Sequence, residues 1–351
     1  MCTIAAYNGT RTAAPILVDM MRRLEGLDGG FYTGIATIHE GKIYSAKVAG
    51  DLERLLNTTD ALKLPGTIGF IHSRTPGSVK SDFAEMGHPF TAEIGGETQT
   101  ALILNGCGGV FGQDIVTKIP GAALRMQERG YTLKSHNNVI GNVTMPDGSK
   151  VHSNDVRCQM GCGKIANGMD AAFAMQEVFS EIPAEAVSLV LSLTEPEAIC
   201  FARLCMPMHV GFCDHGAYMS TAPLAFAEET CNYTLLPPMS YGKVYRKKFE
   251  AAPFVHAPAT VAPITPQVMA KAYEYIEEKL RTPMPFTKIG WSDVLNELYP
   301  KADCTQRGTV AYQVISELHR QGRLKMETRY IEGQTADLRA PVFWLSICDE
   351  K

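Results

Sequence analysis

The sequence has no long apolar run and no excess of charge of either sign. No window of its 351 residues approaches the roughly 18 consecutive apolar residues that a membrane-spanning helix needs. The first residues lack the basic, apolar and small-residue regions of a signal peptide. Its 33 Lys and Arg side chains against 37 Asp and Glu give a net charge of −4, too weak to indicate a polyanionic partner or a membrane surface. These absences predict a cytoplasmic protein without membrane contact.

The ten cysteines form no framework of regular spacings, so we expect reduced thiols rather than disulfides. Cys158 and Cys162 are four residues apart, as are Cys205 and His209, and a zinc site could be assembled only if the fold joined these two distant pairs. The glycine-rich stretch before Phe111 is broken by that residue, so it does not complete a dinucleotide-binding fingerprint. We therefore predict neither a bound metal nor a cofactor.

The pattern of apolar residues predicts a chain with many strands and about two domains. Hydrophobic residues make up 45% of the sequence and charged residues 20%, as in ordinary globular proteins. Short turns such as Glu40-Gly41 between neighbouring strands favour mostly antiparallel sheets over a doubly wound parallel sheet. The predicted strands cover residues 3–7, 31–39, 42–48, 67–72, 100–104, 188–193, 199–205, 210–212, 217–220 and 232–236. Helical periodicity is found at residues 13–27, 119–129 and 167–182.

The composition changes near residue 250. Four prolines interrupt an Ala-rich, weakly charged segment, so we interpret residues 251–266 as a linker between a domain at 1–250 and a second at 267–351. The second region has three predicted helices and then two strands, the element order of a winged-helix domain; the helices cover 267–280, 291–298 and 306–321, and the strands cover 324–331 and 342–347. Residues 264–351 contain 12 basic and 12 acidic side chains, so a structural or protein-docking role is favoured over DNA binding, which stays possible.

Cys2 is the strongest candidate for a catalytic residue. Removal of Met1 would expose its α-amine, whose ordinary pKa of about 8 allows that amine to act as general base for the thiol of the same residue. A cysteine at this position also occurs by chance, so the interpretation requires further residues suited to the same chemistry.

Three further segments supply such residues. Arg74 follows a predicted strand, where a guanidinium can bind a carboxylate through two parallel hydrogen bonds. Asn105 and Gly106 end another predicted strand and offer a side-chain amide and a backbone N–H as donors to an oxyanion. Asp155 offers a carboxylate to an ammonium group. Taken singly, Arg74 is equally well a surface charge, Asn105-Gly106 a hairpin turn and Asp155 a helix cap.

Taken in order, these residues resemble the class II glutamine amidotransferases, and most nearly the glutaminase half of glutamine–fructose-6-phosphate aminotransferase. The resemblance spans about residues 2–250. The matching stretches are residues 1–4, 21–25, 33–36, 68–74, 88–90, 105–106 and 153–155. It implies an N-terminal nucleophile hydrolase fold of the α+β class, a four-layer αββα sandwich with mostly antiparallel sheets.

The resemblance also implies roles for individual residues. Cys2 would attack the side-chain amide of glutamine, while Asn105 and the N–H of Gly106 would hold the oxyanion. Arg74 would bind the substrate α-carboxylate and Asp155 its α-amine.

His72 and Thr75, close to Arg74, are two further substrate-binding residues by the resemblance. The chain departs from the family at Asp28, where an arginine is usual, and after Thr75, where the family often has a tryptophan and a longer lid.

The sequence therefore predicts a glutaminase that hydrolyses L-glutamine to glutamate and ammonia through a thioester at Cys2. Because the region after the linker is too short for a sugar-phosphate isomerase, we expect a separate synthase chain to accept the ammonia. Two alternatives stay open: another amidase of the N-terminal nucleophile type, and a non-catalytic glutamine sensor that binds DNA.

Overall fold

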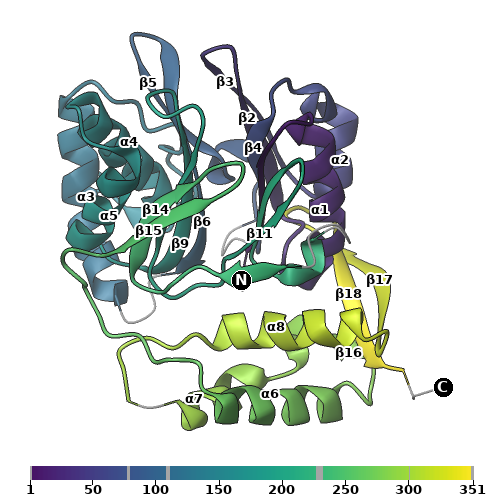
Figure 1. Ribbon diagram of the computed structural model, residues 1–351. Helices are drawn as coiled ribbons and strands as arrows, with labels where there is room; N and C mark the ends of the chain where they lie inside the picture. The colour runs from purple at the N-terminus through teal and green to yellow at the C-terminus, as the bar shows by residue number, and fades with distance from the viewer. Residues whose placement is uncertain (1, 77–79, 108–110, 227–231, 300, 349–351) are drawn as a thin grey trace.

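Two antiparallel β-sheets lie face to face in the structure, a computed structural model that describes residues 2–76, 80–107, 111–226, 232–299 and 301–348 (Figure 1). The seven-stranded sheet has the order β13-β11-β12-β1-β4-β2-β3, and the six-stranded sheet has the order β15-β14-β10-β9-β6-β5. Every strand pair in these two sheets is antiparallel, which confirms the predicted sheet type.

The strands of the seven-stranded sheet are β1 (Thr3–Gly9), β2 (Tyr32–His39), β3 (Lys42–Ala49), β4 (Ile68–Arg74), β11 (His209–Cys213), β12 (Gly216–Ser220) and β13 (Tyr233–Leu235). Those of the six-stranded sheet are β5 (Phe90–Ile94), β6 (Glu97–Cys107), β9 (Glu185–Ser192), β10 (Ile199–Arg203), β14 (Ser240–Val244) and β15 (Phe249–Pro253). A short hairpin joins β7 (Val143–Thr144) and β8 (Lys150–Val151).

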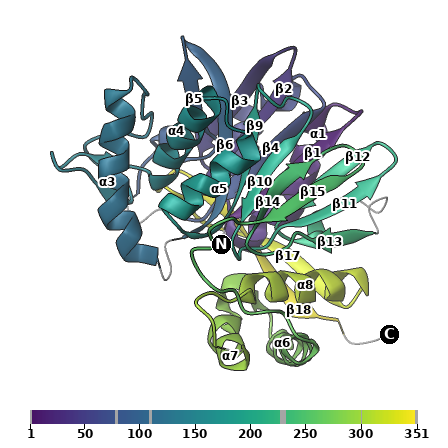
Figure 2. The same ribbon diagram turned by 60° about the vertical axis from the view of Figure 1, so that its left-hand side comes forward.

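Helices cover the outer face of each sheet, so the layers run helix, sheet, sheet, helix (Figures 1 and 2). The seven-stranded sheet is covered by α1 (Ala13–Asp28) and flanked by α2 (Leu52–Thr58), and the six-stranded sheet is covered by α3 (Gly112–Glu128), α4 (Ser153–Ala166) and α5 (Ala171–Glu181). This is the αββα arrangement that the resemblance implies.

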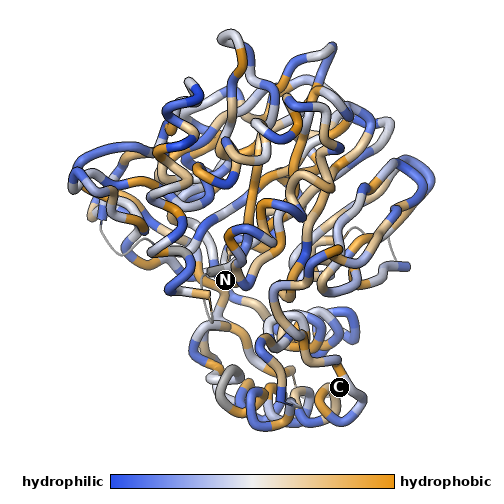
Figure 3. The backbone as a smooth tube through the Cα atoms, turned by 90° about the vertical axis from the view of Figure 1, so that its left-hand side faces the viewer, coloured by the Kyte–Doolittle hydropathy of each residue, from blue (hydrophilic) through white to orange (hydrophobic). Residues whose placement is uncertain are grey.

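Successive side chains of a strand point to opposite faces, so each sheet has a separate buried core on each face. In β1, Ile4 and Ala6 pack between the sheets with Phe70 of β4, whereas Ala5 and Tyr7 belong to the core beneath α1. Figure 3 shows the hydrophobic segments concentrated in the central strands. The strands are therefore buried on both faces, and their ends are the positions where polar side chains can gather around a pocket.

The C-terminal residues form α6 (Pro266–Lys279), β16 (Met284–Pro285), α7 (Trp291–Leu298), α8 (Arg307–Arg320), β17 (Leu324–Glu332) and β18 (Arg339–Ile347). These elements follow the predicted order of three helices and two long strands, with the short β16 completing a sheet of order β16-β18-β17. Helix α8 lies between α6 and the large sheets (Figure 1). Val310 and Ile315 of α8 share one buried cluster with Leu17 of α1.

Polar contacts also tie α8 to the large sheets. Arg203 at the end of β10 donates to Gln306 Oε1 (2.8 Å), and the backbone N–H of Leu224 donates to Ser316 Oγ (3.0 Å). The C-terminal helices are therefore packed into the same structure as the sheets, and the division into two domains stays a prediction.

Several elements differ from the sequence prediction, in their boundaries or in their presence. Strand β6 continues through Asn105 and Gly106 to Cys107, because both residues pair with β9. Strand β15 extends to Pro253, beyond the expected boundary at residue 250; it is an edge strand, the position in a sheet that tolerates proline. Helix α4 was not predicted, because nearly all of its residues are buried and it has no amphipathic stripe. No described helix combines the length and the apolar character needed to cross a membrane.

Candidate active site

A pocket of about 170 Å³ opens beside Cys2, where ends of both sheets meet the start of α4. Cys2, Arg74 and Thr75 line it from the seven-stranded sheet. Leu104 and Gly106 line it from β6, and His88 comes from just before β5. The start of α4 contributes His152, Ser153, Asn154 and Arg157. The pocket is smaller than the 300–1,000 Å³ common for drug-sized ligands, so it suits a compact substrate.

The thiol of Cys2 is prepared for nucleophilic attack by its neighbours. Its Sγ lies 3.9 Å from Thr75 Oγ1. Burial raises the pKa of the thiol, but hydrogen bonding and charge from His72 outweigh burial and lower the pKa to about 6. His72 Nε2 donates to the carbonyl of Leu104 at 3.1 Å, and Nδ1 has no hydrogen-bond partner within the described structure. The influence of His72 on the pKa of Cys2 differs from the substrate contact expected from sequence.

Arg74 lines the pocket as predicted. Its NH1 donates to the carbonyl of Met86 (2.6 Å), and its guanidinium lies 5.2 Å from the ring centroid of Tyr32. Burial lowers the pKa of Arg74, although a guanidinium stays charged near neutral pH. The described structure gives it no carboxylate partner, so it can bind a substrate carboxylate.

A buried carboxylate fixes the end of β4 that bears Arg74. Glu25 of α1 accepts hydrogen bonds from Ser73 Oγ (2.8 Å), Thr33 Oγ1 (2.9 Å) and the backbone N–H of Leu52 (2.9 Å). Ser73 Oγ in turn accepts from the backbone N–H of Gly30 (2.7 Å). Burial raises the pKa of Glu25 to about 7 despite these donors. This network holds β4 against α1 and so determines where Arg74 projects.

Asn105 and Gly106 sit in β6 next to the pocket. Asn105 is fully buried, and neither Nδ2 nor Oδ1 has a hydrogen-bond partner within the described structure. A buried amide without partners is costly, and this one lies directly before Gly106, which lines the pocket, although Asn105 itself does not. Gly106 has φ +146, and a Cβ there would lie 2.1 Å from the carbonyl of Glu185. No other residue fits at position 106.

Asp155 does not line the pocket, although its segment does. Its Oδ2 accepts from the backbone N–H (2.8 Å) and Oγ (2.7 Å) of Ser135, and its Oδ1 accepts from Gln159 Nε2 (3.2 Å). Both oxygens are thus used inside the fold. Asn154 lines the pocket at the neighbouring position.

Arg157, one turn further along α4, is a site residue that sequence reasoning missed. It is 1% exposed, donates to Asn154 Oδ1 (3.1 Å) and to the carbonyl of Ile182 (3.4 Å), and leaves Nε without a partner. Burial lowers the pKa of this guanidinium to about 10. A buried cation of this kind gives no signal in the sequence, since only the fold determines which arginines are enclosed.

His88 and His152 were also missed as site residues. Burial, together with nearby cations such as Arg74, places the pKa of both imidazoles well below its usual range, so both are neutral. Asn154 Nδ2 lies 3.2 Å from His88 Nε2. Because Arg157 can only donate to Asn154 Oδ1, Nδ2 must donate to His88, which leaves the proton of His88 on Nδ1. That Nδ1 has no partner in the described structure. The stretch at 88–90, matched in the resemblance, was the available signal.

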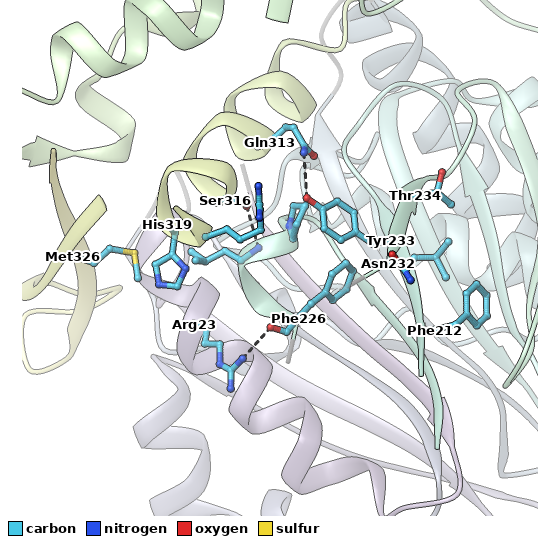
Figure 4. A pocket seen from close by; sticks show the side chains of 14 residues that line it. Arg23, Phe212, Phe226, Asn232, Tyr233, Thr234, Gln313, Ser316, His319 and Met326 are labelled. Atoms are coloured by element: carbon cyan, nitrogen blue, oxygen red, sulfur yellow. Dashed lines mark hydrogen bonds between the residues drawn. The ribbon is translucent and has the colours of Figure 1, made fainter. Parts of the chain in front are cut away.

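A larger cavity of about 1360 Å³ lies elsewhere, between α8 and the edge of the seven-stranded sheet. In Figure 4 Gln313 of α8 donates to Tyr233 of β13, and Arg23 of α1 donates to the carbonyl of Phe226. Among the hydroxyl-bearing residues that line it, Ser316 is already bonded to the Leu224 N–H and to the carbonyl of Tyr312. This cavity lacks the activated thiol of the first pocket. Across the described residues, no three His, Cys, Asp or Glu side chains are grouped as metal ligands.

Comparison with solved structures shows the class of fold. Glutamine phosphoribosylpyrophosphate amidotransferase from B. subtilis superimposes with a TM-score of 0.55 at 14% identity, covering 79% of this chain and 52% of that one. A structure described as the allosteric regulatory enzyme of purine biosynthesis gives 0.56 at 13% identity, with the same shares covered. The chain thus has the fold of glutamine amidotransferases.

Sequence comparison then gives the more particular relatives. Glutamine–fructose-6-phosphate aminotransferase of Pyrococcus horikoshii is 27% identical over 253 residues, which are 71% of this chain and 37% of the relative. The enzyme of the same name from Bacteroides thetaiotaomicron is 25% identical over 236 residues, 66% of this chain and 33% of the relative. No family model matches the chain. The chain is therefore similar to these enzymes over about two thirds of its length, and it spans about a third of the length of the curated relatives it matches.

Proposed function

We propose that the protein hydrolyses the side-chain carboxamide of glutamine, or of a close relative of glutamine, with Cys2 as nucleophile. The observation that carries this proposal is the thiol of Cys2, whose pKa is about 6, at the edge of a pocket that also holds a guanidinium and adjoins a buried amide donor. In the first step the thiolate attacks the amide carbon, and Asn105 and the Gly106 N–H stabilise the oxyanion.

Collapse of this intermediate releases ammonia and leaves a thioester on Cys2. The leaving nitrogen needs a proton, which the α-amine freed by removal of Met1 or the His72 imidazole can supply. Water then hydrolyses the thioester to the acid and restores the thiol. Arg74 holds the carboxylate at the far end of the substrate throughout, while Thr75 lies beside the sulfur.

Two measurements test the proposal, both on protein whose intact mass shows that Met1 is absent. The first is ammonia release from glutamine. The second is covalent labelling by 6-diazo-5-oxo-L-norleucine, an electrophilic glutamine mimic. We expect one adduct, located on Cys2. The Cys213→Ala variant serves as the matched control, because Cys213 lies on β11 and contacts Gly216 rather than the pocket. Equal ammonia release by Cys2→Ala and Cys213→Ala would disprove the proposal.

A second candidate, another amidase of the N-terminal nucleophile type, is favoured by one observation. Asp155, the residue expected to bind the substrate α-amine, is used by Ser135 and Gln159, and the pocket has Arg157 near that place instead. The chemistry at Cys2 is the same in both candidates. They differ in what the far end of the substrate carries.

We also propose that a separate synthase chain accepts the ammonia and that residues 267–351 form a winged-helix-like unit with a structural or docking role. Its third helix, α8, is largely buried against the sheets instead of free to enter a DNA groove. Several of its basic side chains are paired with glutamates, among them Arg320 with Glu317 and Arg329 with Glu327. Salt-sensitive, nanomolar binding of the full chain to a DNA duplex would contradict this role.

A further inference from the structure

The end of the pocket formed by α4 is electropositive. Arg157 lines it as a buried guanidinium whose hydrogen bonds go to an amide oxygen and a backbone carbonyl, and Nε has no partner in the described structure. Arg74 lines the same pocket. The described residues that line it include no Asp or Glu. A cavity with two cations and no carboxylate favours an anionic ligand and opposes a second cation.

The neutral side chains at this end of the pocket also offer hydrogen-bond donors. Because His88 Nε2 accepts from Asn154, the proton of His88 is on Nδ1. This buried Nδ1–H has no partner in the described structure. Two side-chain acceptors at this end are already used: Asn154 Oδ1 accepts from Arg157, and Asn142 Oδ1 accepts from the backbone N–H of Ser153 (2.8 Å). An ammonium group placed here would meet donors and few acceptors. A carboxylate or carbonyl oxygen would satisfy donors that are otherwise unpaired.

We propose that the natural substrate is a glutamine-type carboxamide without an α-ammonium group, a monoamide of a dicarboxylic acid, and that Arg157 and Asn154 determine this specificity. The proposal rests on the proposed function, because it assumes that Cys2 cleaves the amide. The carboxylate binds between the two guanidiniums, and the small volume of the pocket restricts the α-carbon to hydrogen, hydroxyl or oxo substituents.

The experiment compares ammonia release from glutaramate and from L-glutamine, which differ only in the α-ammonium group. We expect kcat/KM for glutaramate to exceed that for L-glutamine by about tenfold or more, because a buried guanidinium repels the ammonium. A ratio of one or less overturns the proposal. If neither amide is hydrolysed, or if Cys2→Ala keeps full activity, the proposed function itself fails, so the two failures are distinguishable.

The Asn154→Asp variant tests the two residues with little change of shape. A carboxylate at position 154 pairs with Arg157 and offers an acceptor to an ammonium group, so we expect the ratio to shift toward L-glutamine by tenfold or more. An unchanged ratio contradicts the proposal. The exposed Asn57 on α2 gives the matched control, since Asn57→Asp makes the same charge change outside the pocket.

Arg157→Met and Arg157→Lys separate charge from packing. Arg157→Met removes the cation from a fully enclosed site, and its melting temperature shows whether the variant is folded. We expect folded Arg157→Met to lose the preference for glutaramate through a higher KM, and Arg157→Lys to restore part of it. If Arg157→Met does not fold, Arg157→Lys and Asn154→Asp still test the proposal. Retention of the full preference for glutaramate over L-glutamine in both variants would overturn it.

Discussion

The two ends of the pocket differ in how their polar groups are satisfied. At the nucleophile end, Ser73 and Glu25 hold the strand that bears Arg74, and His72 is oriented by the carbonyl of Leu104. At the α4 end, Arg157 Nε and His88 Nδ1 have no partner among the described residues. The strand that bears Arg74 is therefore fixed before substrate arrives, and the unpaired groups at the two ends suit different parts of a ligand: the Asn105 amide suits an oxyanion, whereas Arg157 Nε and His88 Nδ1 suit an acceptor at the far end.

Under the proposed function, the two ends of the pocket have different roles. Reactivity is determined by strand ends from β1, β4 and β6, whose positions follow from backbone pairing. Specificity is determined by the first turns of a buried helix, where a single side chain can change without disturbing the sheets. The following predictions test this difference, from the largest expected effect to the smallest.

Loss of the nucleophile has the largest effect. We expect Cys2→Ala to lower kcat by roughly 10⁴-fold or more, because removing a covalent nucleophile leaves only binding and oxyanion stabilisation. Steady-state ammonia release measures the change, and Cys213→Ala should retain full activity. A Cys2→Ala enzyme within tenfold of the parent would place the chemistry elsewhere.

Removal of Arg74 should affect binding more than turnover. Arg74→Ala deletes a charged contact made to the unreacting end of the substrate, so we expect KM to rise about 10- to 100-fold with a small change in kcat. Arg74→Lys should recover part of the loss, because an ammonium keeps the charge without the bidentate geometry. A fall confined to kcat would show that Arg74 acts on the reacting atoms instead.

The thiol of Cys2 should titrate near pH 6. Its pKa is lowered from 9.0 to about 6, so the thiolate forms as the pH rises through 6 and iodoacetamide alkylation should follow that curve. In His72→Gln the main lowering influence is lost and the curve should move up toward 9. At pH 7 the thiolate fraction then falls by up to about 100-fold. Mass spectrometry of the Cys2 peptide against pH measures both curves. Coincident curves would show that His72 does not lower the pKa of Cys2.

The contact between Ser135 and Asp155 should matter for stability and not for specificity. Ser135→Ala removes one of the two Ser135 donors to Asp155 Oδ2 and also the acceptor of the His152 backbone N–H (3.0 Å), and we expect a loss of about 1–3 kcal/mol in the free energy of unfolding. Denaturant unfolding measures this loss. The ratio of kcat/KM for glutaramate and L-glutamine should stay unchanged. A changed ratio would indicate that Asp155 contributes to substrate binding.

The sequence by itself predicted Cys2 as the nucleophile and determined much of the architecture. Cys2, Arg74 and Gly106 lie at or near strand ends that apolar patterning locates, and the order of their motifs along the chain marked them as candidates. Antiparallel sheets follow from short turns between neighbouring strands, which is also local information.

Only the tertiary structure decided the specificity end of the pocket. Asp155 and Asn154 are adjacent in the sequence and equally plausible there, yet the packing of α4 directs Asp155 to Ser135 and places Asn154 in the pocket. Arg157 becomes a site residue because α4 is enclosed on nearly all sides, and burial of this kind leaves no amphipathic period in the sequence. Local sequence determines where strands start and end, whereas the partners of a buried polar side chain depend on residues distant in the chain.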